Sequence, residues 1–245
     1  MLREDLDRWL NHGISPNTRM LYLGGTQTEE MDGEISWTAA WKVIRGLHYL
    51  EATGASGKKP ITILMNSVGG DWSMGMAIYD AIKQCKNHVT IINLSHARSM
   101  TSVILQAADY RITSPSGYYL IHDGSMGIED INRSVISNAE YERDHALPMM
   151  YQVYVDRMRE ADPAVVAEII NSKLPDGAEK VQARRGVKMS HISQLCTRDT
   201  FFTATEMVQL NLADRLLEAG DLIGAYANPD LHGRPIGSDS LLIDE

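Results

Sequence analysis

The amino-acid sequence predicts an α/β fold built on a parallel sheet. Three short apolar runs bounded by turn residues are typical of buried strands, and they cover residues 60–66, 88–94 and 117–123. Segments with apolar residues at helical spacing separate these runs, so strands and helices alternate along the chain. This alternation indicates parallel strands joined by right-handed crossovers.

Composition and charge restrict the possible functions. The chain has 245 residues, of which 44% are hydrophobic, and this is enough for a sizeable core in one large domain. Its formal net charge of −9 argues against binding to nucleic acid, because phosphate contacts need a basic face. Two cysteines, Cys85 and Cys196, are too few for a disulfide framework or a four-cysteine zinc site, and we expect no metal.

We expect no membrane segment. The first residues carry charges where a secretory signal peptide would need an apolar stretch. No apolar run approaches the roughly 18 residues that a membrane-spanning helix needs. The chain is therefore expected to be cytoplasmic, which the low cysteine content also favours.

The first half of the chain holds three expected helices. The first covers residues 36–53, with Ser36 as its cap. Its apolar stripe comprises Trp37, Ala40, Trp41, Ile44 and Leu47. The second begins near Ser73, and its stripe comprises Met74, Ala77, Ile78, Ala81, Ile82 and Cys85. The third covers residues 100–109.

The next stretch is mostly helical. We expect a long helix over residues 130–161, which Pro148 should kink or break, and a short helix over 163–172 that begins after Asp162. Residues 173–190 have weak periodicity and five Lys or Arg against two Asp or Glu, so we interpret them as an exposed insertion. A solvated loop is the simpler explanation of those charges, and a basic face for a partner is the alternative.

Residues 201–218 predict a capped helix followed by a short strand. Asn211 stands where the helix would end in a left-handed residue, which asparagine tolerates. The tail from Gly220 is rich in Gly, Asp and Pro, and we expect it to be extended or disordered at its end.

Ser99 stands between the strand 88–94 and the helix 100–109. A side chain at this junction lies at the carboxyl edge of the sheet, where ligands of open α/β sheets bind. The helix start also presents unpaired N–H groups that suit a developing oxyanion. Because serine is a favoured helix cap as well, the sequence alone leaves two interpretations open, a nucleophile and a cap.

Two glycines, Gly69 and Gly70, follow the preceding strand and open another helix. Glycine lets backbone amides approach a ligand closely, although such pairs often only make a turn. Junctions that follow neighbouring parallel strands lie side by side at one sheet edge. The amides of Gly70 and Met100 could therefore act together as an oxyanion hole.

A hydroxyl nucleophile needs a base, and the base needs an orienting acid. Of the eight histidines, His122 alone ends a strand of the same series, so its ring should reach the edge that carries Ser99. A structural role is the alternative for such a histidine. Asp123 should point to the opposite face of the strand, and Asp109 is turned away. Asp199 is the best remaining acid, although spacing alone does not select it.

Five ordered segments within residues 18–217 resemble one known family. They are "MLYLGG", "MNSVGGDWSMGMAIYDAI", "ARSM", "LIHDG" and "TRDTFFTATEM". They are similar to the first strand, the "INSPGG…GMAIYD" signature, the "ASM" nucleophile motif, the "MIHQP" histidine motif and the "ERDRFLSAPEA" motif of the ClpP proteolytic subunit. That family is the serine peptidase of the ATP-dependent Clp protease.

The resemblance implies a ClpP/crotonase-like α/β fold, with parallel-sheet ββα units and a protruding helical handle. It implies that Ser99, His122 and Asp199 form a catalytic triad. By the same comparison, the backbone amides of Gly70 and Met100 would form the oxyanion hole.

The resemblance also implies an assembly and its partners. In the family, stacked heptameric rings of identical subunits receive unfolded polypeptides from an AAA+ unfoldase. The unfoldase uses the ATP, so this subunit would need no cofactor of its own. We expect it to bind neither nucleic acid nor membrane. Arg198 matches an arginine that contributes to contacts between rings. The chain then divides into an N-terminal segment, 1–17, a serine peptidase domain, 18–218, with an insertion near 173–190, and a tail, 219–245.

The sequence departs from the family pattern in the N-terminal segment, which lines the axial pore in relatives and does not match clearly here, and at three further places. Val68 stands where the family usually has proline. The 77 positions from His122 to Asp199 exceed the usual separation by about a helical hairpin, which we assign to the insertion near 173–190. Pro148 falls in the helix that forms the handle, so the contact between rings is expected to differ.

Other functions remain to be compared with the peptidase. A crotonase-type acyl-CoA enzyme would share the fold, the paired amides and a "T-A-x-E" closing helix, but it would not need Ser99 and His122 together. A catalytically silent ring subunit would scaffold an active paralogue, and the intact set of three residues argues against it. A serine–lysine peptidase is disfavoured, because no lysine lies in the matching motifs.

Overall fold

The computed structural model describes residues 3–24, 33–53, 59–125 and 132–227. Within these residues an eight-stranded sheet has the order β1-β2-β3-β4-β5-β8, and β6 pairs with both β4 and β7. The strands are β1 (Ile14–Ser15), β2 (Met20–Gly24), β3 (Ile61–Ser67), β4 (Val89–Arg98), β5 (Tyr110–Thr113), β6 (Tyr118–Ile121), β7 (Thr200–Thr203) and β8 (Arg215–Leu216). Successive strands of the path β2-β3-β4-β5-β8 pair in parallel, as do β4 and β6, which confirms the predicted parallel sheet. Two strands are antiparallel to their neighbours: β1 to β2, and β7 to β6.

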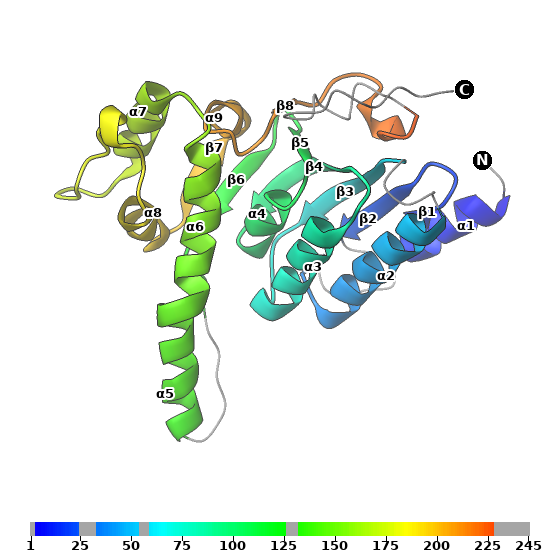
Figure 1. The fold of residues 1–245 in the computed structure, drawn as a ribbon, viewed down its shortest axis with the longest axis horizontal. Helices are drawn as coiled ribbons and strands as arrows, with labels where there is room; N and C mark the ends of the chain where they lie inside the picture. The colour runs from blue at the N-terminus through cyan, green and yellow to red at the C-terminus, as the bar shows by residue number, and fades with distance from the viewer. Residues whose placement is uncertain (1–2, 25–32, 54–58, 126–131, 228–245) are drawn as a thin grey trace.

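Helices flank the sheet and extend beyond it (Figure 1). They are α1 (Arg3–His12), α2 (Trp37–Thr53), α3 (Trp72–Gln84), α4 (Met100–Leu105), α5 (Asn132–Tyr141), α6 (Leu147–Met158), α7 (Pro163–Lys173), α8 (Met189–Cys196) and α9 (Ala204–Gln209). The helices predicted over 36–53, from Ser73 and over 163–172 are confirmed. The third predicted helix, 100–109, is shorter than expected, because the chain turns after Leu105 to enter β5.

Apolar side chains cover both faces of the sheet. On one face Ile63 and Ile91 belong to the same buried cluster as Ile78 and Ile82 of α3. On the other face a smaller cluster comprises Met20, Leu64, Ile92, Ile112 and Ala225, with Trp9 packed against it. A sheet buried on both faces needs apolar residues at successive positions, which explains the continuous apolar runs in the sequence.

Both ends of the chain contribute to this second face. From the N-terminal segment 1–17, α1 is fixed by Asp5, whose carboxylate accepts a hydrogen bond from the Ser15 hydroxyl at 2.9 Å. From the tail, the Ala225 amide donates to the Thr62 hydroxyl at 2.7 Å, so the residues just after Gly220 fold back onto β3. The expectation of an extended or disordered end concerns residues 228–245, which lie outside the described residues.

The predicted apolar stripe of α2 is partly wrong. Trp37 and Trp41 are 70% and 53% exposed, whereas the helix buries Ala40, Val43, Gly46, Leu47 and Leu50. The cause is the close contact at Gly46, where a Cβ atom would lie 2.5 Å from Leu21 Cδ2. The face that contains glycine approaches the sheet, and the two large aromatic rings are turned outward.

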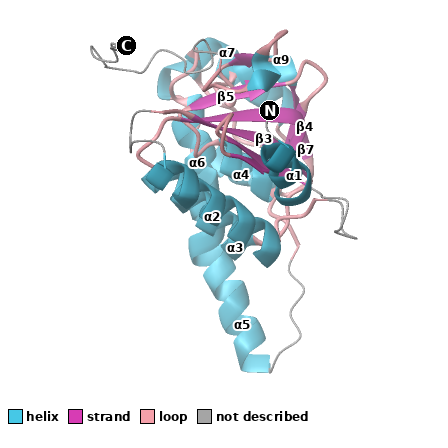
Figure 2. Ribbon diagram, turned by 90° about the vertical axis from the view of Figure 1, so that its right-hand side faces the viewer, coloured by secondary structure: helices cyan, strands magenta, loops and turns pink. Residues whose placement is uncertain are grey.

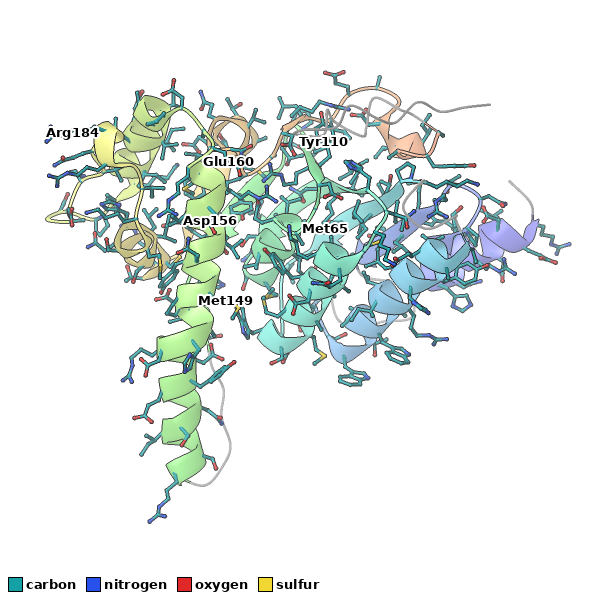
Figure 3. The ribbon with its side chains drawn as sticks, in the orientation of Figure 1. Met65, Tyr110, Met149, Asp156, Glu160 and Arg184 are labelled. Carbon is teal, nitrogen blue, oxygen red and sulfur yellow. The ribbon has the colours of Figure 1, made fainter. Side chains whose placement is uncertain are left out.

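The helical handle comprises residues 132–158 and extends away from the sheet, on the side where α2 and α3 pack (Figures 1 and 2). Figure 3 shows Met149 and Asp156 along its α6 part. Pro148 does not break it, because a π-helical segment, Glu142–Ala146, joins α5 to α6 and the Leu147 amide donates to the Glu142 carbonyl. A wider turn suits a proline, which has no N–H to donate and would clash with a carbonyl in regular α-helical register.

The insertion near 173–190 is not simply exposed. Val181 and Val187 are buried in the main core, and the Asn171 side chain of α7 makes two hydrogen bonds to the Val181 backbone, at 2.8 and 3.0 Å. Apolar anchors at wide spacing give no periodic signal, so the sequence pattern missed them.

The segment 201–218, predicted as a capped helix followed by a short strand, begins as a strand instead and contains the predicted helix and short strand as α9 and β8. Residues 200–203 form β7, in which Phe202 is buried and Phe201 is 48% exposed, an alternation typical of a strand. The helix then starts at Ala204, capped by the Thr203 hydroxyl on the Glu206 amide. Asn211 has φ of 55°, which confirms the predicted left-handed residue.

A buried ion pair joins β5 to the segment before β8. The Arg111 side chain, 3% exposed, meets the Asp214 carboxylate at 2.8 Å and also donates to Gln106. Replacing Asp214 by alanine would leave the guanidinium buried without its anion. We expect Asp214→Ala to lower the free energy of unfolding by about 3 kcal/mol, measured by urea denaturation.

The matched control for this prediction is Asp156→Ala, which removes an exposed ion pair with Arg159. Exposed pairs contribute little to stability, so this variant should unfold close to the wild-type midpoint. Equal midpoints for Asp214→Ala and Asp156→Ala would contradict a stabilising role for the buried pair.

Candidate active site

Ser99 occupies a strained turn between β4 and α4. Its φ and ψ angles are 50° and −125°, and a positive φ is uncommon for a residue with a Cβ atom. Although Ser99 holds the N-cap position of α4, its side chain makes no capping hydrogen bond within the described residues. Of the two interpretations that the sequence left open, the structure therefore does not support a side-chain cap. Strain of this kind is concentrated at functional sites.

Neighbouring segments hold this turn from several sides. The Ser99 amide donates to the Leu120 carbonyl of β6 at 3.0 Å, and the Ser99 carbonyl accepts from the Ser102 hydroxyl at 2.6 Å. The buried Thr101 hydroxyl lies 3.0 Å from the Ser67 carbonyl at the end of β3. Sequence reasoning missed Thr101 and Ser102, because a hydroxyl within a short helix carries no local sign of what it contacts.

The turn at Gly69 packs directly against Ser99. A Cβ atom on Gly69 would lie 2.8 Å from Ser99 Cβ and 3.2 Å from the Met100 amide nitrogen. Gly69 also has φ of 103°, a conformation that other residues rarely adopt. Its amide donates to the Ser67 hydroxyl at 3.3 Å, so this loop has a local support even though Val68 replaces the family's proline.

Gly70 forms an isolated bridge with Ile35 just before α2. The two hydrogen bonds of the bridge use the Gly69 carbonyl and the Asp71 amide, at 2.7 and 2.8 Å, so the Gly70 amide takes no part in them. The Met100 amide belongs to the first residue of α4, where N–H groups have no helical acceptor. The two expected oxyanion donors thus belong to turns that touch.

His122 and Asp199 meet because β6 and β7 are antiparallel. Ile121 pairs with Thr200, and the next opposed positions are His122 and Asp199. His122 Nδ1 lies 3.1 Å from Asp199 Oδ1. His122 Nε2 is buried and makes no hydrogen bond to any residue that the structure describes.

One cleft brings most of the predicted residues together. It has a volume of about 700 Å³ and is lined by Gly70, Ser99, Met100 and His122, together with residues of α3 and of the helical handle. Asp199 contacts His122 and does not itself appear among the residues lining the cleft. Ser99 and His122 do not form a hydrogen bond with each other here, and such bonds often tighten only when substrate binds.

Two further charged residues lie beside this arrangement. Asp123 accepts a hydrogen bond from the Tyr151 hydroxyl at 2.5 Å, whereas His122 is paired with Asp199. Arg198 is exposed and donates a hydrogen bond to the Lys173 carbonyl at 2.9 Å. The role expected for Arg198 in contacts between rings stays a prediction, because the structure contains a single subunit.

Comparison with known proteins gives the same family as the motifs. A family model described as "Clp protease" matches residues 23–168. The chain belongs to the Clp protease family. This confirms the resemblance that was drawn from the motifs around Ser99 and His122.

Relatives in the Clp protease family share modest identity with this chain. Proteolytic subunit 2 of the ATP-dependent Clp protease from Treponema denticola is 34% identical over 51% of this chain and 58% of its own length. The proteolytic subunit from Chlorella vulgaris is 28% identical over 81% of each chain. Subunit 3 from Synechococcus sp. (strain CC9605) is 28% identical over 81% of this chain and 82% of its own.

The part of the chain that the structure describes has neither a membrane-spanning helix nor a cluster of metal-ligating side chains. In residues 3–24, 33–53, 59–125 and 132–227, no helix has both the length and the apolar character needed to cross a membrane. The same ranges contain no group of three His, Cys, Asp or Glu side chains placed to hold a metal ion.

The contact between Gly69 and Ser99 leads to a prediction. We expect Gly69→Ala to reduce the rate at which a fluorophosphonate labels Ser99 by more than about tenfold, because the added methyl group must displace the Ser99 turn. Intact-mass measurements over time give the labelling rate.

Gly177→Ala is the matched control. Gly177 has φ of 80°, so alanine is strained there too, but nothing lies within 4 Å of the added methyl group. It should label at the wild-type rate. If both variants lost labelling equally, backbone strain rather than the Gly69–Ser99 contact would explain the effect.

Proposed function

We propose that this chain is a serine endopeptidase that acts through Ser99, His122 and Asp199. The observation that carries the proposal is the pairing of His122 with Asp199 at 3.1 Å beside a cleft that His122 and Ser99 both line. The strained Ser99 turn and the adjoining Gly69–Gly70 turn support it. Membership of the Clp protease family supports a peptidase in general.

The proposed reaction has two steps. The Ser99 oxygen forms a bond to the peptide carbonyl carbon while its proton moves to His122 Nε2, and the amides of Gly70 and Met100 hold the carbonyl oxygen as it becomes an anion. The carbon–nitrogen bond then breaks, and His122 returns the proton to the leaving amine. In the second step His122 removes a proton from a water molecule, which attacks the carbonyl carbon of the acyl-enzyme. The ester bond then breaks, the peptide fragment leaves with a new carboxyl terminus, and Ser99 regains its proton.

Asp199 acts on the histidine rather than on the substrate. Its carboxylate accepts a hydrogen bond from Nδ1, which fixes the tautomer with a free lone pair on Nε2. That is the nitrogen that has to accept the serine proton, and it is the one without another partner within the described residues.

The proposal extends to substrate and assembly. We infer unfolded polypeptides as substrates, within stacked rings of identical subunits in the cytoplasm, supplied by an AAA+ unfoldase that uses ATP. Two observations support this: relatives are named proteolytic subunits of an ATP-dependent protease, and the helical handle extends away from the body of the domain (Figure 1). Native mass spectrometry of the full chain would measure the number of subunits, with fourteen expected for two heptamers.

A crotonase-type reaction on acyl-CoA would use the amides of Gly70 and Met100 but not the serine–histidine pair. Reaction with a fluorophosphonate separates the two functions. Covalent labelling at Ser99 supports the peptidase, whereas affinity for CoA without labelling would support the crotonase reaction. A catalytically silent subunit would show neither.

Removal of the nucleophile gives the direct test. We expect Ser99→Ala and His122→Ala each to lower kcat for a short fluorogenic peptide by at least about 10³-fold, because the members of such a triad act as a unit. Asp199→Asn should also lower kcat strongly, since the tautomer of His122 is no longer fixed.

Ser116→Ala is the control, since Ser116 lies on an exposed turn between β5 and β6. It should hydrolyse the peptide at the wild-type rate. Casein should be assayed in parallel, because peptide cleavage without casein cleavage would indicate a competent site that needs a partner for access. Retained peptide hydrolysis in Ser99→Ala would contradict the proposed function.

A further inference from the structure

Two tyrosines at the base of the helical handle each contact one half of the candidate active site. Tyr151 and Tyr154 are three residues apart on α6, so they lie on the same side of the helix. Both side chains are buried, at 7% and 0% exposure. Neither was singled out by the sequence.

Tyr151 contacts the segment that carries the histidine. Its hydroxyl lies 2.5 Å from Asp123 Oδ1, and the Asp123 amide donates to the Cys196 carbonyl at 2.8 Å, three residues before Asp199. Burial, and next the Asp123 carboxylate, raise the pKa of Tyr151 above its ordinary value. The phenol therefore stays protonated, and its hydroxyl donates a hydrogen bond to Asp123, the residue adjacent to His122.

Tyr154 contacts the turn that carries the serine. Its hydroxyl lies 2.6 Å from the Ser102 hydroxyl, which itself donates to the Ser99 carbonyl at 2.6 Å. Because the Ser102 proton is used in that bond, Tyr154 is the donor to Ser102. Burial raises the pKa of Tyr154 well above its ordinary value, so its proton is retained as well.

We propose that Tyr151 and Tyr154 are positioning residues that set the separation of Ser99 and His122. One rigid turn of α6 holds both sides of the cleft, through Asp123 on one side and Ser102 on the other. The base of the helical handle thereby controls the alignment of the nucleophile and the base. This inference rests on the proposed function, since it assigns these two residues their catalytic roles.

Tyr→Phe substitutions test the two hydroxyl groups while keeping the rings. We expect Tyr151→Phe and Tyr154→Phe each to lower kcat for a short fluorogenic peptide by about tenfold or more, with KM changed less than about twofold, because a small misplacement of reacting groups is costly. The rate of fluorophosphonate labelling at Ser99 should fall in parallel. Tyr49→Phe, on α2 and 46% exposed, is the matched control and should retain wild-type values.

Double variants distinguish positioning from general packing. If Tyr151 acts through Asp123, then Tyr151→Phe combined with Asp123→Ala should be no slower than the slower single variant. The same relation should hold for Tyr154→Phe combined with Ser102→Ala. If the loss of kcat in a double variant equalled the product of the losses in its two single variants, each tyrosine would act independently of its partner, and the proposal would be overturned. If Tyr154→Phe does not fold, as circular dichroism would show, Ser102→Ala alone tests that side by the same kcat and labelling measurements.

The outcomes also separate this inference from the proposed function. Wild-type kcat and labelling in both Tyr→Phe variants, alongside loss of activity in Ser99→Ala, would overturn the positioning role and leave the peptidase intact. Retained hydrolysis in Ser99→Ala would overturn the peptidase itself. Lower melting temperatures with unchanged kcat and labelling would show a purely structural role for the tyrosines, which contradicts the inference.

Discussion

The contact between two strand-to-helix turns, at Gly69 and at Ser99, is the constraint on which the rest of the site depends. Parallel pairing of β3 with β4 brings the turns together, and the absence of a Cβ atom on Gly69 lets them touch. A strained residue such as Ser99 costs on the order of 1–3 kcal/mol, so surrounding bonds have to hold it. Thr101, Ser102 and the backbone of β6 supply those bonds.

The sheet provides two kinds of pairing, and each positions a different half of the site. Parallel pairing places the nucleophile and the amide donors at one edge, because the neighbouring strands β3 and β4 both end there. Antiparallel pairing of β6 with β7 places the imidazole opposite the carboxylate, because register fixes which residues face one another. A purely parallel sheet would have carried the Asp199 segment away from His122.

Local patterns predicted much of this molecule, and long-range register accounts for most of what they missed. Strands β3 and β4, helices α2 and α3, and the junction at Ser99 follow from periodicity and turn residues. Asp199 was chosen by elimination and by the family resemblance, since no pattern encodes the β6–β7 register over 77 positions. Trp37 and Trp41 were misassigned because hydrophobicity alone does not show which face of a helix meets the core.

The π-helical segment, Glu142–Ala146, has a consequence for the outer part of the helical handle. A π-helical turn holds about one residue more than an α-helical turn, so it absorbs an extra residue locally and the helix on either side keeps its orientation about the common axis. The exposed apolar side chains of Ile136 and Tyr141 therefore face the same way, relative to α6, as they would in a regular α-helix that is one residue shorter. Removing one residue from Glu142–Ala146 would convert the turn to regular α-helix and leave that surface facing in the same direction.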